Sequence, residues 1–283
     1  MPPYVLAVQL PTIFSKNFHT NLFVKHGNKY LNSYFCIMLH FFKTKPILKD
    51  VIPSNYIDIH SHLLPGIDDG ATSMDNTITL TKELLLLGTK QLITTPHVIQ
   101  YVWPNTKEKI LSNAETTIKT IEESGLTVPF KVAAEYLMDD SFLHLFQNES
   151  LLTLKDNYVL VEMSYINAPF QLYNILFDLK VAGYIPVLAH PERYLFYHKN
   201  MEEYNKLKKA GCFFQLNLLA TMGYYGGEIS KVADKLLQKG MYDFVGSDVH
   251  HEKHLKAFHQ KLMIKETTGL KEVISNNQFF AFD

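Results

Sequence analysis

From residue 56 onward, short β-branched or aromatic runs alternate with helical stretches, and this alternation most constrains the fold. The runs expected to form strands are residues 56–60, 91–95, 131–136, 158–163, 185–189, 213–218 and 242–246. The intervening stretches 73–87, 105–124, 169–182, 201–210 and 228–239 each end at a glycine, the residue that stops helices most readily. The connection between the third and fourth strands is weak as a helix. Seven β/α units in series predict an α/β fold with a parallel sheet, either an incomplete TIM-like barrel or, second, a doubly wound open sheet.

The N-terminal segment, before the first expected strand, differs from this pattern. The first 55 residues carry six lysines against one acidic residue, Asp50, and show no sustained helical or strand period. No secretory signal pattern is present, because no basic residues precede the apolar run 5–10 and no cleavage site follows. We therefore expect residues 1–50 to be a disordered N-terminal extension, with 1–37 upstream of a natural start at Met38, and residues 51–283 to be the folded domain.

Charge and cysteine content exclude several classes of protein. The net charge is −1, and 21 basic residues face 27 acidic ones from residue 56 onward, which disfavours nucleic acid or an anionic membrane as partner. Cys36 and Cys212 form no disulfide framework, which predicts a cytoplasmic protein. The sequence contains no run of about 18 apolar residues, so no membrane span is predicted.

Polar side chains follow six of the seven expected strands. They are His60, His62, Asp69, His97, Glu135, Glu162, His190, Asp248 and His250. In (β/α) barrels the carboxyl ends of all strands face one mouth, so these side chains should converge. Mixed imidazole and carboxylate ligands suit manganese, iron or zinc, and two or three divalent ions could be held. The remaining histidines from residue 56 onward, 144, 198, 251, 254 and 259, are expected at the surface, with His251 a partial exception because it adjoins the last ligand motif.

Arg193 is the single arginine beside 26 lysines, and it follows the fifth strand. A guanidinium grips phosphate through two parallel hydrogen bonds, which lysine cannot do. We expect Arg193 to bind a phosphoryl group; the alternative is a structural salt bridge to Glu192. Aromatic residues on the same loops could flank an aryl ring or simply pack in the core. They are Tyr101, Trp103, Tyr165, Tyr194, Tyr224 and Tyr225.

The order of these motifs resembles the PHP (polymerase and histidinol phosphatase) superfamily, and more closely its capsule-associated bacterial protein-tyrosine phosphatases. The motifs are Asp58-Ile59-His60-Ser61-His62, Pro96-His97, Ala134-Glu135, Ala189-His190-Pro191-Glu192-Arg193-Tyr194 and Gly246-Ser247-Asp248-Val249-His250. The resemblance implies a distorted TIM-like (β/α)7 barrel with a trinuclear metal site, most often manganese. It implies one ion on His60, His62, Glu135 and Asp248, a second shared by Glu135 near Glu162 and His250, and a third on Asp69, His97 and His190. Asp69 is preferred to Asp68 because it directly precedes Gly70.

The same resemblance implies hydrolysis of a phosphomonoester. The catalytic residues would be Arg193, Asp248 and His250, and the substrate-binding residues Arg193, Tyr165, Tyr194 and Tyr225. The implied substrate is phosphotyrosine in a protein, a bacterial tyrosine kinase that controls capsule or exopolysaccharide synthesis. A histidinol phosphatase with the same metals is the first alternative; a nuclease and a regulatory domain without turnover are the others. Lys253 stands where some relatives carry a second arginine.

Overall fold

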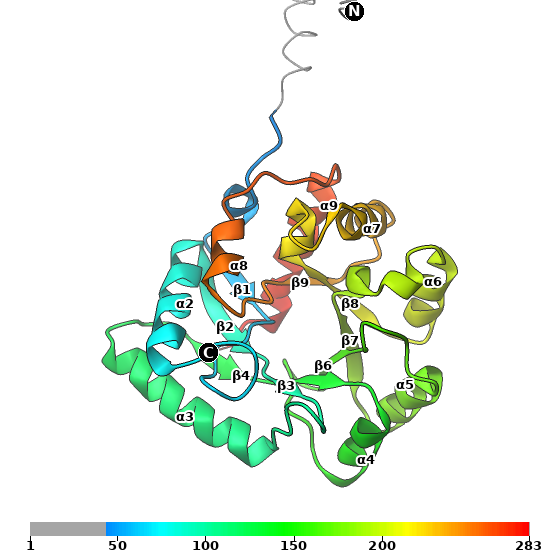
Figure 1. The fold of residues 1–283 in the computed structure, drawn as a ribbon, viewed down its shortest axis with the longest axis horizontal. Coiled ribbons are helices and arrows are strands. Elements are labelled where there is room, and N and C mark those ends of the chain that lie inside the picture. The colour runs from blue at the N-terminus through cyan, green and yellow to red at the C-terminus, as the bar shows by residue number, and fades with distance from the viewer. Residues whose placement is uncertain (1–43, 283) are drawn as a thin grey trace, which may run out of the picture. The chain divides into compact units, whose positions relative to one another are not determined.

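The computed structural model describes residues 44–282, and the compact unit begins at Lys45. Its strands are all parallel and lie at the centre, with helices outside them (Figure 1). One sheet has the order β1 (Tyr56–Asp58), β2 (Thr89–Thr94), β4 (Phe130–Val132). The other has the order β3 (His97–Val98), β5 (Glu135–Leu137), β6 (Tyr158–Glu162), β7 (Ile185–Ala189), β8 (Phe213–Asn217), β9 (Phe244–Gly246).

The third expected strand, 131–136, is divided between the two sheets as β4 and β5. The chain passes from β2 to β3 through Pro96, which has no N–H to give to a ladder. Backbone hydrogen bonds nevertheless continue across the break, from Ala133 N to Thr94 O (2.9 Å) and from Glu135 N to Pro96 O (3.1 Å). The two sheets therefore follow one another without a large shift in strand pairing.

The segments that follow the first and last strands are also paired with each other. Asp248 N donates to His60 O (2.7 Å), and His62 N donates to Val249 O (2.9 Å). Asp58 supports this junction, because its buried carboxylate accepts hydrogen bonds from the backbone N and hydroxyl of Ser247. The first two ligand histidines and the last ligand motif are thereby held side by side.

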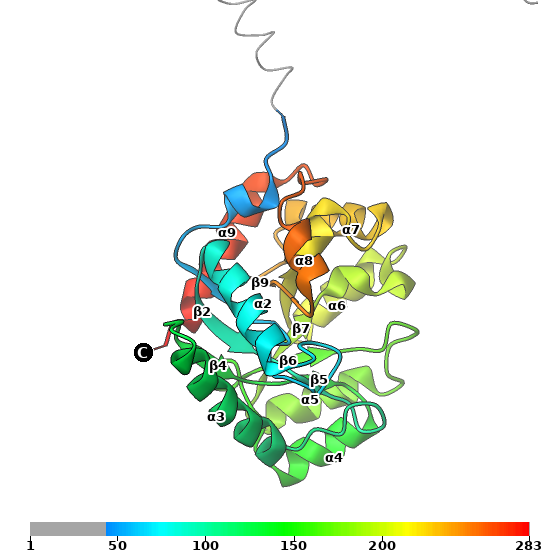
Figure 2. The ribbon, with the colours of Figure 1, turned by 60° about the vertical axis from the view of Figure 1, so that its left-hand side comes forward.

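The helices follow the strands in alternation. They are α2 (Met74–Leu86), α3 (Lys107–Glu123), α4 (Asp140–Asn148), α5 (Leu172–Val181), α6 (Met201–Lys209), α7 (Gly227–Gln238), α8 (Glu252–Ala257) and α9 (Thr267–Asn276). Short 3-10 turns are η1 (Leu48–Val51), η2 (Pro191–Arg193), η3 (Leu195–Tyr197), η4 (Leu218–Met222) and η5 (Asn277–Phe280). Helix α8 lies beside α2 in both views (Figure 1 and Figure 2).

Helix α4 corrects the expectation of a weak connection between the third and fourth strands. Asp139 caps its first turn by accepting a hydrogen bond from Phe142 N (2.9 Å). Phe142 and Phe146 lie four residues apart and bury one face of the helix in the core. The helix has only nine residues, and its local helix propensity is low. Packing of these two rings in the core stabilises the helix.

The N-terminal boundary also differs from residue 51. Leu48 and Val51 of η1 are buried in the main hydrophobic core, and Leu48 N donates to Gln260 O (3.0 Å). The expectations for residues 1–43 lie outside the described residues. Among residues 44–282, no helix is both long and apolar enough to cross a bilayer.

Candidate metal centre

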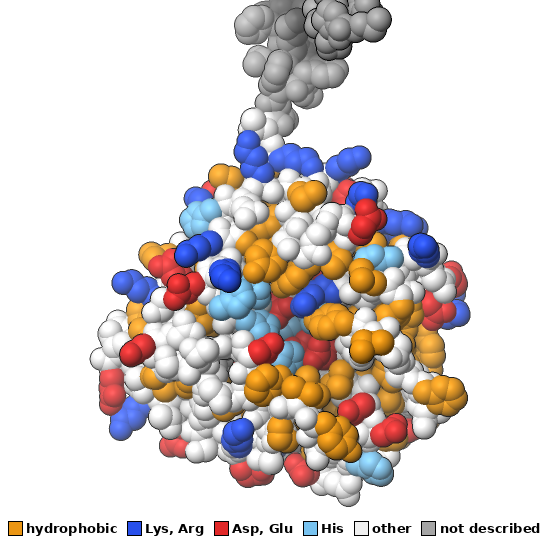
Figure 3. All heavy atoms as spheres, in the orientation of Figure 1, with side chains coloured by type: hydrophobic (Ala, Val, Ile, Leu, Met, Phe, Trp, Pro, Cys, Tyr) orange, Lys and Arg blue, Asp and Glu red, His pale blue; other side chains and the backbone are white. Residues whose placement is uncertain are grey.

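The polar residues expected at the strand ends gather at the carboxyl ends of the strands. Figure 3 shows histidine and acidic side chains at the floor of a hollow, bordered by hydrophobic side chains. The hollow is a cavity of about 370 Å³. Its walls come from residues in or after six different strands and from α8. They are Asp69, His97, Ile99, Trp103, Glu162, Tyr165, His190, Arg193, Tyr225, Asp248, His250, His251 and His254.

The innermost group surrounds His60, whose side chain is fully buried. His60 Nε2 lies 3.2 Å from Glu135 Oε2, 3.3 Å from Asp248 Oδ1 and 3.3 Å from His62 Nε2. Gln215 Oε1 accepts a hydrogen bond from His60 Nδ1 (2.8 Å), because the amide nitrogen of Gln215 already donates to Leu216 O. The proton on Nδ1 leaves Nε2 with a free lone pair directed at the carboxylates, as a metal ligand requires.

Glu135 joins this group to its neighbours. Its Oε1 lies 3.1 Å from His190 Nε2, and its Oε2 lies 3.2 Å from His97 Nδ1. Burial alone would raise the pKa of Glu135, but His60 and His97 hold it well below its usual value. The carboxylate is therefore charged and available to bridge two sites.

Two unsatisfied atoms test whether this set fits metal ions. Glu135 Oε2 and His97 Nδ1 are buried and have no hydrogen-bond partner among the described residues. Buried polar atoms are normally paired, so such atoms facing one another mark a missing partner. A divalent cation would satisfy both. Imidazole and carboxylate donors together fit a first-row divalent ion.

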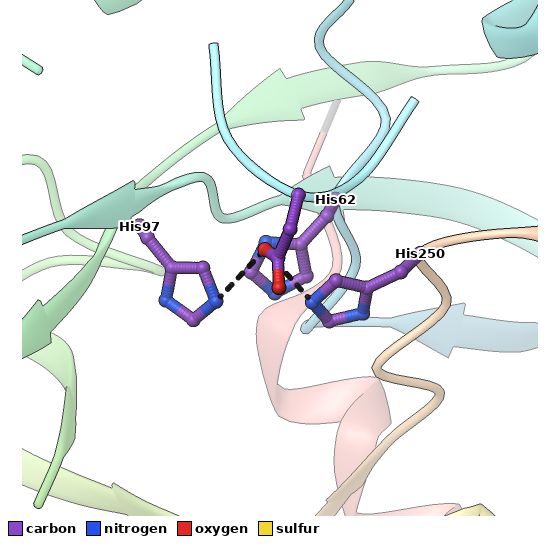
Figure 4. Close-up of side chains that lie close together, drawn as sticks. His62, His97 and His250 are labelled. Atoms are coloured by element: carbon purple, nitrogen blue, oxygen red, sulfur yellow. Dashed lines mark ion pairs between the residues drawn. The ribbon is translucent and has the colours of Figure 1, made fainter. Parts of the chain in front are cut away.

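The outer group lies around Asp69. His97 Nε2 lies 3.5 Å and His250 Nε2 lies 3.6 Å from Asp69 Oδ1, and the rings of His62 and His250 stack at 3.8 Å. Figure 4 shows the rings of His62, His97 and His250 turned toward one another. These four side chains could hold an ion at the cavity surface.

Asp68 and Asp69 have different positions despite being adjacent. The buried Asp68 carboxylate accepts hydrogen bonds from His62 Nδ1 (2.9 Å), Gly70 N (2.9 Å) and His97 N (3.1 Å). The Asp69 carboxylate, with a side chain 57% exposed, faces the cavity instead. Asp69 is thus the carboxylate that faces the cavity, whereas Asp68 holds the His62 ring through Nδ1.

The grouping of ligands differs from the one that the family resemblance implied. His190 lies with His60 and Glu135, whereas His250 lies with Asp69 and His97. His190 adopts a left-handed conformation (φ 37°) where it leaves β7. Glu162 Oε1 lies 3.0 Å from His97 Nδ1 and completes a group with Glu135.

Arg193 lies above the cluster at the cavity wall. Its Nη1 donates to Asp248 Oδ2 (2.9 Å), and its guanidinium lies between the rings of Tyr165 (4.6 Å) and Tyr225 (4.2 Å). No ion pair with Glu192 is present among residues 44–282. Glu192 instead accepts hydrogen bonds from Asn217 N and the Tyr242 hydroxyl, each at 2.9 Å.

Two residues lie elsewhere than the sequence suggested. Tyr194, predicted to bind substrate, is fully buried and does not line the cavity: its hydroxyl accepts from Met163 N (2.9 Å) and donates to Ala189 O (3.1 Å), so it fastens β6 to β7. His254, expected at the surface, is buried and lines the cavity, with Nδ1 3.1 Å from Asp248 O. Both side chains face inward because of tertiary packing, which no local sequence pattern encodes.

Sequence reasoning missed the two amides of β8. Asn217 Nδ2 donates to Asp248 Oδ2 (2.7 Å) and to the Tyr225 hydroxyl (3.1 Å), while Gln215 holds His60. Residues 215 and 217 share one face of the strand, which is the signal that could have found them. Gly246 allows this approach, because a Cβ there would lie 2.6 Å from both Gln215 Nε2 and His60 Cβ.

Comparison with known proteins gives a consistent set of relatives. The chain is 25% identical over 236 residues to the putative tyrosine-protein phosphatase CapC of Staphylococcus aureus, covering 78% of this chain and 92% of that protein. It is 28% identical over 198 residues to the tyrosine-protein phosphatase YwqE of Bacillus subtilis (strain 168), covering 70% of this chain and 78% of that protein.

A solved structure is similar over most of the fold. It comes from work on YwqE of Bacillus subtilis and CpsB of Streptococcus pneumoniae, described there as metal-dependent tyrosine phosphatases. It superposes with a TM-score of 0.67 at 25% identity, covering 80% of this chain and 88% of that one. The profile of the family described as "Capsular polysaccharide synthesis, CpsB/CapC" matches residues 56–265, a span that contains every ligand of the centre. With its ligand clusters and this match both covering the strand ends, the chain belongs to the CpsB/CapC family.

Proposed function

We propose that this chain is a metal-dependent protein-tyrosine phosphatase, which hydrolyses the phosphomonoester of phosphotyrosine in a protein. The observation that carries this proposal is the position of Arg193, stacked between two tyrosine rings beside a cluster of metal-ligand side chains in one cavity. The names of the relatives, CapC, YwqE and CpsB, support the tyrosine substrate. The proposed protein substrate is a bacterial tyrosine kinase that controls capsule or exopolysaccharide synthesis in the cytoplasm.

The cofactor is proposed to be two or three divalent ions. Manganese is the first choice, and iron and zinc are the alternatives. His60, His62, Glu135 and Asp248 would hold the inner ion, and Glu135 would share a second with Glu162, beside His190. Asp69 would hold the outer ion with His97 and His250. Bound ions would lower the pKa of a water nucleophile and polarise the phosphoryl oxygens.

Arg193 supplies the phosphoryl contact in this proposal. Its guanidinium can direct two N–H groups at oxygens whose charge changes during the reaction. Tyr165 and Tyr225 hold it from both faces, and both are proposed to contact the substrate ring. Asp248 presents Oδ2 to Arg193 and Oδ1 to His60, so one carboxylate aligns the guanidinium with the ligand cluster.

His250 acts as a ligand rather than a proton donor in this arrangement. Its Nδ1 donates to Asp248 O (2.9 Å), because a carbonyl oxygen can only accept. Nε2 is therefore left unprotonated toward Asp69 and the cavity. Burial, the largest cause, and the neighbouring His62 lower the pKa of His250, which favours the same neutral form.

The fold is proposed to be the distorted TIM-like (β/α)7 barrel. Pairing of the segments after β1 and β9 supports closure, because the first and last strands of a barrel must be neighbours. The folded phosphatase domain is proposed to start at Lys45 and to follow an N-terminal extension. In such a barrel, the candidate metal centre lies at the mouth, where the carboxyl ends of the strands meet.

The test is a metal-supplemented assay of three substrates with the full chain. We expect a phosphotyrosine peptide to be hydrolysed well above a phosphoserine peptide and histidinol phosphate, with all turnover lost after chelation. A preference for histidinol phosphate would replace the tyrosine assignment with small-molecule hydrolysis at the same centre. Turnover that survives complete removal of metal would contradict the metal-dependent mechanism itself.

A further inference from the structure

A second cavity, of about 510 Å³, lies between the first turn of α3 and helix α4. We call it the α3–α4 groove. In Figure 1, strand β3 lies between these two helices, and the chain leads from β3 into α3. The groove shares one wall with the metal centre. That wall is the hairpin of residues 97–103, which is closed by Ile99 N to Trp103 O (3.0 Å) and Trp103 N to Ile99 O (2.8 Å).

Side chains alternate across this wall. His97, Ile99 and Trp103 line the metal centre, whereas residues 98, 100 and 101 line the groove. The extended residues 97–99 alternate between the two sides, and the turn at residues 100–102 directs Gln100 and Tyr101 to the groove, so one short hairpin serves both cavities. A chain that leaves the metal centre over the hairpin therefore enters the α3–α4 groove directly.

The crest of the hairpin carries adjacent exposed apolar residues. Tyr101 is 90% exposed and Val102 is 60% exposed. Tyr101 is one of the aromatic residues for which the sequence left open an aryl contact or core packing, and it lines the groove on the far side of the wall. Apolar side chains presented together at the edge of two cavities indicate a contact surface rather than a packing role.

The charges of the groove favour one kind of occupant. Glu108 and Glu149 line it and are exposed. Lys107 also lines it, but its Nζ already donates to Ser150 O (3.0 Å) and Ser150 Oγ (2.6 Å). Exposed carboxylates beside exposed apolar side chains complement a segment that carries basic and apolar side chains.

We propose that the α3–α4 groove binds the polypeptide that flanks the phosphotyrosine, with basic residues of the substrate against Glu108 and Glu149. This inference rests on the proposed function and extends it to a recognition subsite. The argument is continuity: a protein substrate cannot end at its phosphotyrosine ring, and the hairpin joins the two cavities. An extended segment of about three residues spans roughly 10 Å, which suits a short flank.

The experiment compares two substrates that share the same chemistry. Phenyl phosphate has no flank, whereas a phosphotyrosine peptide with lysines on both sides has two. Tyr101→Ser removes the crest, and the double change Glu108→Lys with Glu149→Lys reverses the charge. Phe177→Ser, at a residue of α5 that is 66% exposed and outside both cavities, is the matched control.

We expect Tyr101→Ser and the charge reversal each to raise KM for the lysine-flanked peptide at least about fivefold. Their kcat/KM for phenyl phosphate and the kinetics of Phe177→Ser should match the unaltered protein. The charge reversal should not affect a peptide flanked by neutral residues. Equal losses on both substrates, or no loss on the peptide, would overturn the inference. If the unaltered protein hydrolyses neither substrate, the proposed function fails instead.

Discussion

Nη1 of Arg193 donates a hydrogen bond of 2.9 Å to Oδ2 of Asp248, although 55 residues separate them in the chain. The other oxygen of Asp248 lies 3.3 Å from His60 Nε2. The Asp248 carboxylate thus contacts the single guanidinium of the chain with one oxygen and the innermost group of side chains with the other. Variants of Arg193 must therefore preserve the hydrogen bond to Asp248 if effects on substrate and on metal content are to be separated.

Arg193→Lys should lower kcat/KM for a phosphotyrosine peptide by about 10²-fold, because an ammonium cannot make two parallel bonds or stack between Tyr165 and Tyr225. Metal content should be unchanged, because the lysine ammonium can still donate to Asp248 Oδ2 and hold that carboxylate in place. Steady-state kinetics and elemental analysis of the same preparation measure both quantities. Unchanged turnover would rule out Arg193 as the phosphoryl contact.

Asn217→Leu should weaken metal binding by about 10-fold to 100-fold, although Asn217 is no ligand itself. The variant removes the donor that fixes Asp248 Oδ2 at 2.7 Å and also releases the Tyr225 hydroxyl. Titration of the chelator-treated protein with manganese measures the affinity. Asn205→Leu, at an exposed position of α6, is the matched control and should bind manganese like the unaltered protein.

His60→Ala or His62→Ala should lower bound metal and abolish turnover together, because both imidazoles face the innermost group. Elemental analysis and a phosphotyrosine assay of each variant give the two readouts. Adding excess manganese should restore little activity, since a ligand is lost. If either variant kept its full metal content, the innermost group would not be organised by this pair.

The convergence of the candidate ligand residues on one cavity could be predicted from local pattern. Parallel strands place their carboxyl ends at one edge, so a polar residue just after each strand reaches the same cavity wherever it lies in the chain. Glu135 and Asp248 were predictable from this rule alone, and the structure brings them within reach of His60. The α/β class follows from the same periodicity.

The grouping of ligands could not be predicted, because it depends on backbone conformations that tertiary contacts impose. His190 (φ 37°) and Asp248 (φ 51°) both adopt left-handed conformations that side chains rarely accept. These turns decide which neighbours each side chain faces. The amides Gln215 and Asn217 escaped for another reason: as neutral residues in an apolar strand, they become informative only beside His60 and Asp248.

Asp68→Asn and Asp69→Asn should differ in effect even though the residues are adjacent. Asp69→Asn should lower the number of bound ions, because its carboxylate faces His97 and His250. Asp68→Asn should instead lower the free energy of unfolding of metal-free protein by about 1–3 kcal/mol, because it disturbs the buried acceptors of His62 Nδ1 and Gly70 N. Urea unfolding after chelation and elemental analysis separate the two roles. Identical results for both variants would contradict the assignment.

Glu192 gives the fold a dependence on pH. Burial raises the pKa of this fully enclosed carboxyl to about 7, from 4.5 in an exposed group. The folded protein therefore holds a proton that the unfolded chain releases between about pH 4.5 and 7. Because the folded state binds more protons in this window, the free energy of unfolding falls as pH rises through it.

Glu192→Gln should remove this loss, since an amide can still accept from Asn217 N and pair with the Tyr242 hydroxyl but cannot ionise. The variant should exceed the unaltered protein in free energy of unfolding by about 3 kcal/mol more at pH 8 than at pH 4.5. Urea unfolding of chelator-treated protein at both pH values measures this difference. The other titratable groups are common to both proteins and cancel in the comparison. Parallel pH profiles for the two proteins would show that Glu192 is already ionised in the fold, with its charge stabilised by the two hydrogen bonds.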